Sequence, residues 1–359
     1  MSTTETGERF SRGQSITMTF DATAENVAWL KAWSDAVPTL HFVDICVASL
    51  IKPGSTAAVR DPRKAALLAR LRELDRPHNS FSYLLALAEK VTDTRHGLSD
   101  AELEAQILGD VAAMRAFFQH GRVIEDDAFL AGFARDLRGM PQELSRDACM
   151  RFLRSANDRF RLGDPVAKTD RLRTAELIVR EADALPLPRQ HPVVLVTLAA
   201  LYRNPSAAKI MKFRPDPARF QPENALADIM VISRLLPRKL ELEQMAREER
   251  APFARCSFIT DDTGLAGILG CFEGEATWSE DIGGDTHRTH TTMTVRFAEL
   301  FTELPPGGDG GPGDEAAPLR ARLTRAASPP WELPHNPAES GSAALRAPDR
   351  ALAGGRMCR

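Results

Sequence analysis

The chain has 359 residues, which is longer than a typical single domain and enough for two. Hydrophobic residues make up 43% of the chain and charged residues 26%. This is the composition of a globular protein, and it excludes a wholly disordered chain, a collagen repeat and a coiled-coil rod. The formal net charge is −3, so a surface that binds nucleic acid would have to be local.

Five cysteines are scattered along the chain, and no two of them form a C-x-x-C pair. We therefore expect neither a disulfide framework nor a structural zinc site. The N-terminal segment is polar and lacks the apolar core of a signal peptide. No run of about 18 apolar residues is present, so we expect no membrane-spanning helix and a reducing, cytoplasmic location.

The first predicted elements are an arm, a strand and a helix. Residues 1–14 are predicted to be a flexible arm, and residues 16–20 a short strand. Asp21 can cap a helix that runs to about Ala36. The apolar run 39–51 is predicted to begin as a buried parallel strand and to continue as a helix.

A long helical region follows. Residues 61–76 are charged and helical in pattern, and Asn79 with Ser80 can cap a second helix over 81–93. From Ser99 the pattern stays helical almost to Ala184, with little strand signal. We therefore expect a large helical insertion over 99–185.

A mixed pattern of helices and strands returns at residue 186. The predicted elements are a helix over 191–202, a helix over 223–236 ended by Pro237, a strand over 254–262, a short helix through Phe272 and a strand over 291–297. After Leu304, proline and glycine reach roughly 30% of the residues, a content typical of disorder. The range 304–359 is therefore predicted to be a disordered tail.

Acidic residues occur within apolar runs, where a hydrophobic core would have none. Asp44 lies within HFVDICV, Asp228 lies within ALADIMVI, and Asp261 follows CSFIT. An ionised carboxylate in such surroundings costs several kcal/mol unless it is paired, hydrogen-bonded or coordinated. A fourth acid, Glu89, ends the apolar helix that begins at residue 81.

Each acid also has a purely structural explanation. Asp44 and Asp261 could cap the helices that follow their strands, and Asp228 could pair with an arginine. Glu89 could be a solvated helix residue, and Asp262 a surface or capping residue.

The combination of acids favours a shared site. In an open α/β sheet, functional groups collect beyond the C-terminal ends of the strands, where Asp44 and Asp261 are predicted to lie. Helices can bring Glu89 and Asp228 to the same place, where the four carboxylates would repel one another unless a divalent cation bound. Oxygen ligands select Mg²⁺ or Mn²⁺, with Asp262 as a reserve ligand. Such a site suits the attack of metal-activated water on a phosphodiester.

The four acids and their settings resemble those of the PIN-domain ribonucleases. Asp44 follows Phe-Val, Glu89 follows Leu-Ala, Asp228 follows Ala-Leu-Ala and Asp261 follows Phe-Ile-Thr, in the family's order. The resemblance implies an α/β fold with a doubly wound, mostly parallel sheet. It also implies dependence on Mg²⁺ or Mn²⁺ and cleavage of single-stranded RNA.

The resemblance covers roughly 16–94 and 190–272. It implies a PIN-like domain in two parts, 15–98 and 186–303, on either side of the helical insertion. The sequence departs from the family where Asp44-Ile45-Cys46 replaces Asp-Thr-Asn or Asp-Ser-Ser. This change removes a hydroxyl and an amide that support the metal or the phosphate.

Three functions remain open on this basis. The first is a metal-dependent endoribonuclease that uses Asp44, Glu89, Asp228 and Asp261 as its acids. The second is a catalytically degenerate PIN-like protein that serves for binding or scaffolding, and the third is a phosphatase or other metal-dependent phosphotransferase. In each, the helical insertion could mediate a homo-oligomer or bind a protein partner.

Two basic segments could contact RNA. Residues 203–219 carry five basic residues and one acid, with Phe213 and Phe220 available to stack on bases. Residues 151–180 are rich in arginine. The alternative for both segments is a solvated helix face with local ion pairs.

Overall fold

The structure is a computed structural model, and it describes residues 23–92, 97–139, 145–249, 251–281, 287–304 and 315–324. The chain divides into two compact units, Met1–Val37 and Pro38–Arg359. In the first unit the described element is helix α1 (Ala24–Ala36), whose N-terminus is capped by the Thr23 side chain. The strand predicted over 16–20 and the predicted cap Asp21 lie outside the described residues.

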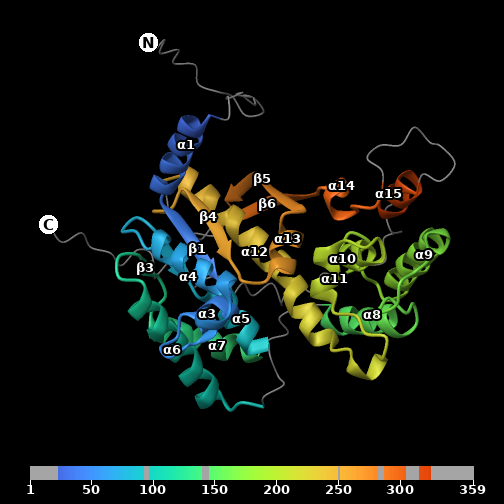
Figure 1. The fold of residues 1–359 in the computed structure, drawn as a ribbon, viewed down its shortest axis with the longest axis horizontal. Coiled ribbons are helices and arrows are strands. Elements are labelled where there is room, and N and C mark those ends of the chain that lie inside the picture. The colour runs from blue at the N-terminus through green and yellow to red at the C-terminus, as the bar shows by residue number, and fades with distance from the viewer. Residues whose placement is uncertain are drawn as a thin grey trace, which may run out of the picture. The chain divides into compact units, whose positions relative to one another are not determined.

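The second unit holds the remaining described elements (Figure 1). The strands are β1 (Thr39–Val43), β2 (Ser80–Ser82), β3 (Arg122–Val123), β4 (Arg255–Ile259), β5 (Phe272–Asp281) and β6 (His287–Val295). The helices before β4 are α2 (Ile45–Leu50), α3 (Ala57–Arg60), α4 (Pro62–Leu74), α5 (Leu84–Thr92), α6 (Asp100–Phe117), α7 (Asp127–Gly139), α8 (Arg146–Asp158), α9 (Lys168–Ala184), α10 (Pro192–Leu201), α11 (Pro205–Met211), the 3₁₀ turn η2 (Pro217–Arg219) and α12 (Pro222–Arg247). The helices after β4 are α13 (Thr263–Leu269), α14 (Phe297–Leu300) and α15 (Ala316–Thr324).

Four strands form a parallel sheet in the order β3-β2-β1-β4. Strand β1 is central: Leu40 is the partner of Ser80 on one side and of Cys256 on the other. Strands β5 and β6 form a separate antiparallel pair. The α/β class and the parallel sheet predicted from the sequence are thus confirmed.

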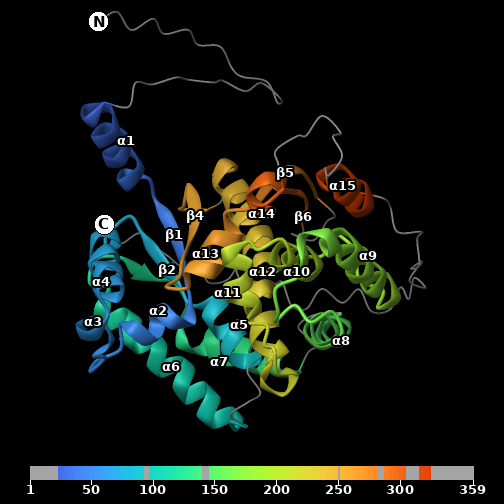
Figure 2. The same ribbon diagram turned by 45° about the vertical axis from the view of Figure 1, so that its right-hand side comes forward.

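The central strand is buried along its whole length, because helices cover both of its faces (Figure 2). Successive side chains of a strand point to opposite faces. Accordingly Leu40 and Phe42 lie in one hydrophobic cluster, while Val43 lies in another together with Phe81 and Tyr83 of the neighbouring chain segment. Helices α8 to α13 supply much of the first cluster, and α2, α5, α6 and α7 supply much of the second.

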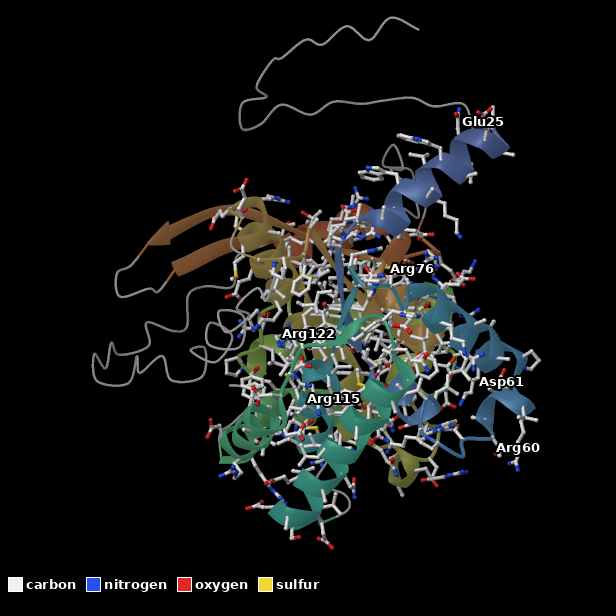
Figure 3. All side chains as sticks on the ribbon, turned by 90° about the vertical axis from the view of Figure 1, so that its left-hand side faces the viewer. Glu25, Arg60, Asp61, Arg76, Arg115 and Arg122 are labelled. Carbon is white, nitrogen blue, oxygen red and sulfur yellow. The ribbon has the colours of Figure 1, made fainter. Side chains whose placement is uncertain are left out.

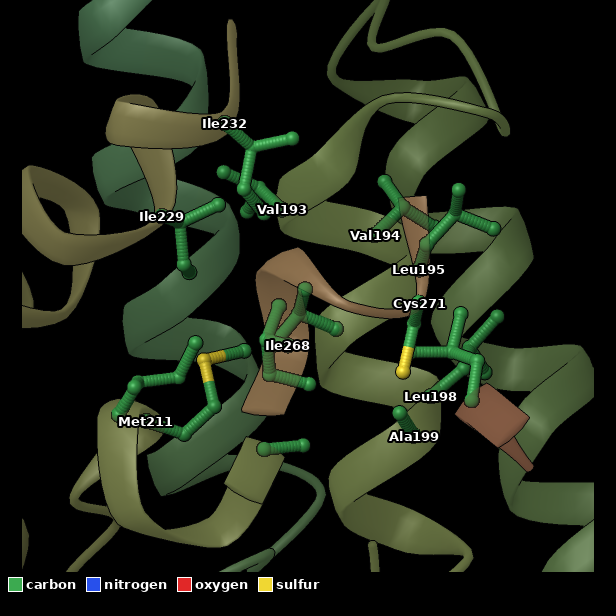
Figure 4. Packing of buried hydrophobic residues seen from close by; sticks show 14 of the residues in the cluster. Val193, Val194, Leu195, Leu198, Ala199, Met211, Ile229, Ile232, Ile268 and Cys271 are labelled. Carbon is green, nitrogen blue, oxygen red and sulfur yellow. The ribbon is translucent and has the colours of Figure 1, made fainter. Parts of the chain in front are cut away.

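The larger cluster joins helices α10 to α13 (Figure 4). Helix α10 is apolar nearly all round, and Val193, Val194 and Leu198 are fully buried in it. Met211 of α11 and Ile229 of α12 pack in the same cluster. This packing fixes α11 and α12 close to the C-terminal edge of the sheet.

The first half of the predicted helical insertion takes part in the sheet layer. Strand β3 pairs with β2, and α6 and α7 contribute buried side chains to the same cluster as Val43. Arg115 of α6 donates hydrogen bonds to Asp127 Oδ1 and to the carbonyl oxygen of Glu125, both at 2.6 Å (Figure 3). Strand β3 was not predicted within the helical insertion, because a strand of two residues is too short to show an alternating pattern.

The prediction for residues 79–93 was partly wrong. Residues Ser80–Ser82 form β2, and the helix begins at Leu84 rather than at residue 81. Two serines flank Phe81, so the segment looks like a helix cap, but all three side chains are buried and the backbone pairs with β1. The tertiary pairing overrides the local signal.

Three further predictions need correction. Helix α12 does not end at Pro237 but continues to Arg247, with Leu235 and Leu240 buried on either side of the proline. This burial offsets the interior proline, which costs about 3 kcal/mol. Helix α13 ends at Leu269, so Phe272 begins β5 instead of ending a helix. Helix α15 lies inside the range expected to be a disordered tail, and its Leu319 and Leu323 are buried.

Candidate active site

The strand order reverses at β1, and we call the region beyond the C-terminal ends of β1 and β4 the crevice. From β1 the chain crosses to β2 and then to β3 on one side, and it later returns to the other side of β1 with β4. Ligands of open α/β sheets bind where the order reverses in this way, beyond the C-terminal ends of the two strands. Here these ends are followed by Asp44, after β1, and by Thr260, Asp261 and Asp262, after β4.

Asp44 is fixed between the two strands. Its backbone N–H donates to the carbonyl oxygen of Ile259 at 3.0 Å, and its side chain is 7% exposed. The Thr260 hydroxyl and the Cys46 thiol, the latter at 3.1 Å, both donate to Asp44 Oδ2. Asp44 occupies the N-cap position of α2, yet its carboxylate makes no capping hydrogen bond. The purely structural explanation of Asp44 as a helix cap is therefore wrong.

The thiol of Cys46 is a hydrogen-bond donor here. Burial, and then the charge of Asp44, raise the pKa of Cys46 to about 12, so the sulfur keeps its proton at neutral pH. The sulfur also accepts a hydrogen bond from the backbone N–H of Asp261 at 3.3 Å. Cys46 thus links the two strand ends at the position where the resemblance expects an amide or a hydroxyl.

Glu89 lies against Asp44 and Asp228. Burial, then the charges of Asp44 and Asp228 and a hydrogen bond to Asp44, together raise the pKa of Glu89 to about 8, against the lowering effect of Arg234. A carboxyl with this pKa is mostly protonated at neutral pH and can donate to Asp44. Glu89 is therefore not the solvated helix residue of the structural explanation.

Asp228 comes to the same place from α12. The Lys212 ammonium donates to Asp228 Oδ2 at 2.7 Å. Burial raises the pKa of Asp228; the hydrogen bond and charge of Lys212 oppose this rise, and the charges of Asp262 and Asp44 add to it. The partner is a lysine and not the arginine considered from the sequence.

The two acids after β4 differ in what they contact. Asp261 Oδ2 lies 3.8 Å from the Lys64 ammonium. Asp262 is the N-cap of α13, and its Oδ1 accepts from the N–H groups of Gly264 and Leu265 at 2.7 and 2.9 Å. The capping explanation considered for Asp261 therefore applies to its neighbour. Of the two acids, Asp262 is the one whose charge acts on Asp228.

The residues of this crevice fit a hard cation in kind. Asp44, Glu89 and Asp228 supply carboxylate oxygens, and the pKa of each of the last two is raised first by burial and further by carboxylate neighbours. As they stand, however, no three His, Cys, Asp or Glu side chains among the described residues are grouped so that they could hold a metal ion. One oxygen of Asp228 is taken by Lys212, and Asp261 faces Lys64.

Sequence reasoning missed the groups that position the acids. Thr260 and Cys46 adjoin predicted acids in the chain, but their hydrogen bonds to Asp44 depend on the pairing of β1 with β4. Lys212 belongs to the basic segment 203–219, and this composition was the one available signal for it.

The basic segments contribute less to a nucleic-acid surface than predicted. Phe220 is buried and Phe213 packs against the hydrophobic cluster, so neither ring is free to stack on a base. Five arginines of 151–180 make ion pairs with nearby acids, as in Arg159–Glu181 at 2.7 Å, which is the alternative considered for that segment; the other four are Arg154, Arg161, Arg171 and Arg180.

No helix in the described part of the chain is both long enough and apolar enough to cross a membrane. Comparisons of the chain with protein-family models, with curated proteins and with solved structures gave no match.

Proposed function

We propose that the protein is an endoribonuclease of PIN-like fold that depends on Mg²⁺ or Mn²⁺ and cleaves single-stranded RNA. The observation that carries the proposal is the placement of the half-buried Glu89 against Asp44 and the half-buried Asp228, near the point where the strand order reverses. A protein gains no stability from burying acids that raise one another's pKa, so such a group in a crevice is a candidate functional site. The parallel strand order supports the doubly wound sheet that the resemblance implies.

In this proposal Asp44, Glu89 and Asp228 hold the metal, and Asp261 and Asp262 lie at its edge. A bound divalent cation would supply an activated water and neutralise charge that develops on the phosphate. The hydroxyl of Thr260 and the thiol of Cys46 orient Asp44 by donating to one of its oxygens. Glu89 must release its proton before its carboxylate can serve as a ligand.

The alternative is a catalytically degenerate PIN-like protein. It is favoured by the lysine on Asp228 and by Cys46 in place of the expected polar residue, since both reduce the readiness of the site for a cation. Titration with Mn²⁺ separates the alternatives, because a cation that binds the folded protein raises its melting temperature. A degenerate site would leave the melting temperature unchanged.

The direct test is cleavage of a labelled single-stranded RNA with Mn²⁺ and with a chelator. We expect Asp44→Asn and Asp228→Asn to lose at least about 100-fold in rate, because each removes a ligand charge while the side chain keeps its shape. Asp164→Asn is the matched control: this acid pairs with Arg161 on an exposed turn and should cleave like the wild type. Equal rates in all four proteins would refute the assignment, and hydrolysis of a small phosphomonoester in preference to RNA would favour a phosphatase.

A further inference from the structure

Lys212 stands at an unusual backbone position. It is the C-cap of α11, with φ 53° and ψ 29° in the left-handed region. Glycine is the usual residue there, and other residues cost of order 1 kcal/mol or more. Such strain tends to occur at functional sites, so this lysine is a candidate for a role that needs its side chain.

Glycines on α13 fix the place of α11 beside the acids. A Cβ atom on Gly264 would lie 2.8 Å from Cβ of Lys209, and one on Gly267 would clash with the Ser206 hydroxyl. Since α13 directly follows the acids after β4, this close contact holds α11 next to the crevice. The ammonium of Lys212 reaches Asp228 from there.

The Lys212–Asp228 pair is asymmetric in its exposure. The lysine side chain is 42% exposed, whereas the aspartate side chain is 19% exposed. The ammonium can therefore leave the carboxylate and be solvated at little cost, while the carboxylate stays in the crevice. Without its lysine, the half-buried carboxylate of Asp228 would favour another cation.

We propose that Lys212 is an internal stand-in for the metal: it occupies Asp228 while the crevice lacks a divalent cation, and when displaced it contacts the phosphate of the substrate. This inference rests on the proposed function. With a divalent cation bound by these carboxylates, the ammonium of Lys212 would be repelled and would turn toward solvent. Metal binding would then supply a basic group for the polyanion at the edge of the site.

Lys209 offers a matched control on the same helix. Its ammonium donates to the Thr263 hydroxyl at 2.8 Å and so does not neutralise one of the proposed ligands. Replacing either lysine by methionine removes the same charge from the same element. A general change of electrostatic potential affects both variants, whereas competition for Asp228 affects one.

The experiment is calorimetric titration of the full chain with Mn²⁺ in the absence of nucleic acid. Lys212→Met should bind Mn²⁺ about fivefold to tenfold more tightly than the wild type, and Lys209→Met within about twofold of it. Lys212→Asn, whose new residue tolerates the left-handed backbone, should behave like the methionine variant, and Lys212→Arg like the wild type.

A second measurement follows the displaced lysine. Fluorescence anisotropy with a short single-stranded DNA as a phosphate-backbone probe should show that Mn²⁺ strengthens binding to the wild type but not to Lys212→Met. Manganese binding that is equal in Lys212→Met and the wild type, or equally tightened in Lys209→Met, overturns this inference alone. No manganese binding by the folded wild type overturns the proposed function as well.

Discussion

Asp110 and the acids of the crevice lie in the same unit, and they are neutralised to different extents. Away from the crevice, Asp110 of α6 is 1% exposed and is contacted by Lys52, by the Lys90 ammonium at 2.5 Å and by the Tyr83 hydroxyl at 2.5 Å. Burial acts to raise the pKa of Asp110, but the hydrogen bonds from these three residues outweigh it and lower the pKa. Asp110 is therefore an ionised acid with its counter-charges built in.

The crevice group has fewer counter-charges for more acids. Lys212 contacts Asp228 and Arg234 acts on Glu89, yet the pKa of Glu89 and of Asp228 is raised. The comparison teaches that burial of an acid does not by itself indicate a site. The crevice differs from Asp110 in its deficit of positive charge, which the proposed divalent cation would fill.

The largest expected effect is a loss of stability when Asp110, the neutralised acid, is replaced. Asp110→Asn should lower the free energy of unfolding by about 3 kcal/mol, because it leaves two ammonium groups without their buried partner. Chemical denaturation measures the loss. Asp136→Asn, on the exposed face of α7, is the control and should change stability little. A loss as small as that of the control would show that Asp110 is not a structural acid.

A smaller effect of opposite sign, a gain in stability at high pH, is expected when Glu89 of the crevice is replaced. The pKa of Glu89 is raised from 4.5 to about 8, so its contribution to stability is fully present below pH 4.5 and is lost as the pH rises through 8. In a chelator, Glu89→Gln should therefore be more stable than the wild type at pH 9, by about 2 kcal/mol, with a flatter pH profile. Asp110 has a lowered pKa, so its contribution is lost instead as the pH falls below its ordinary range. Parallel profiles of the wild type and Glu89→Gln between pH 5 and 9 would contradict the comparison.

The smallest effects come from the hydroxyl donors of the two groups. Thr260→Val and Tyr83→Phe each remove one hydrogen bond to a carboxylate, and each should cost about 1 kcal/mol in stability. The two variants should differ in Mn²⁺ affinity. Thr260→Val should bind Mn²⁺ more weakly, because Asp44 loses a hydrogen bond that orients it, whereas Tyr83→Phe should bind Mn²⁺ like the wild type. Manganese titration of both variants checks this, and an equal change in both would remove the distinction between the groups.

The sequence predicted the elements whose signal is local. The strand Thr39–Val43 and the helices α4 and α10 form as expected, since an apolar run marks the strand and the local residue pattern marks the helices. The three-residue strand β2 and the continuation of α12 through Pro237 could not be predicted, because pairing with β1 and burial of Leu235 and Leu240 decide them.

In the candidate site, too, some residues could be predicted from local sequence and others depend on tertiary contacts. Asp44 and Asp228 stand out in the sequence because each lies in an apolar run, and both reach the crevice. The hydrogen bond from Thr260 to Asp44 joins residues 216 positions apart, and no pattern within either segment indicates it. The lysine on Asp228 depends on the packing of α11 against α13, which is equally invisible in the sequence.

The pairing of β1 has a consequence for synthesis of the protein on the ribosome. One edge of β1 pairs with β2, which follows closely in the chain. The other edge pairs with β4, which is synthesised much later, since the partner of Thr39 is Arg255. Contacts between such distant segments form late, and a growing chain folds from its N-terminus. One wall of the crevice is therefore missing until translation has passed β4, so any activity of this site begins only after most of the chain has been made.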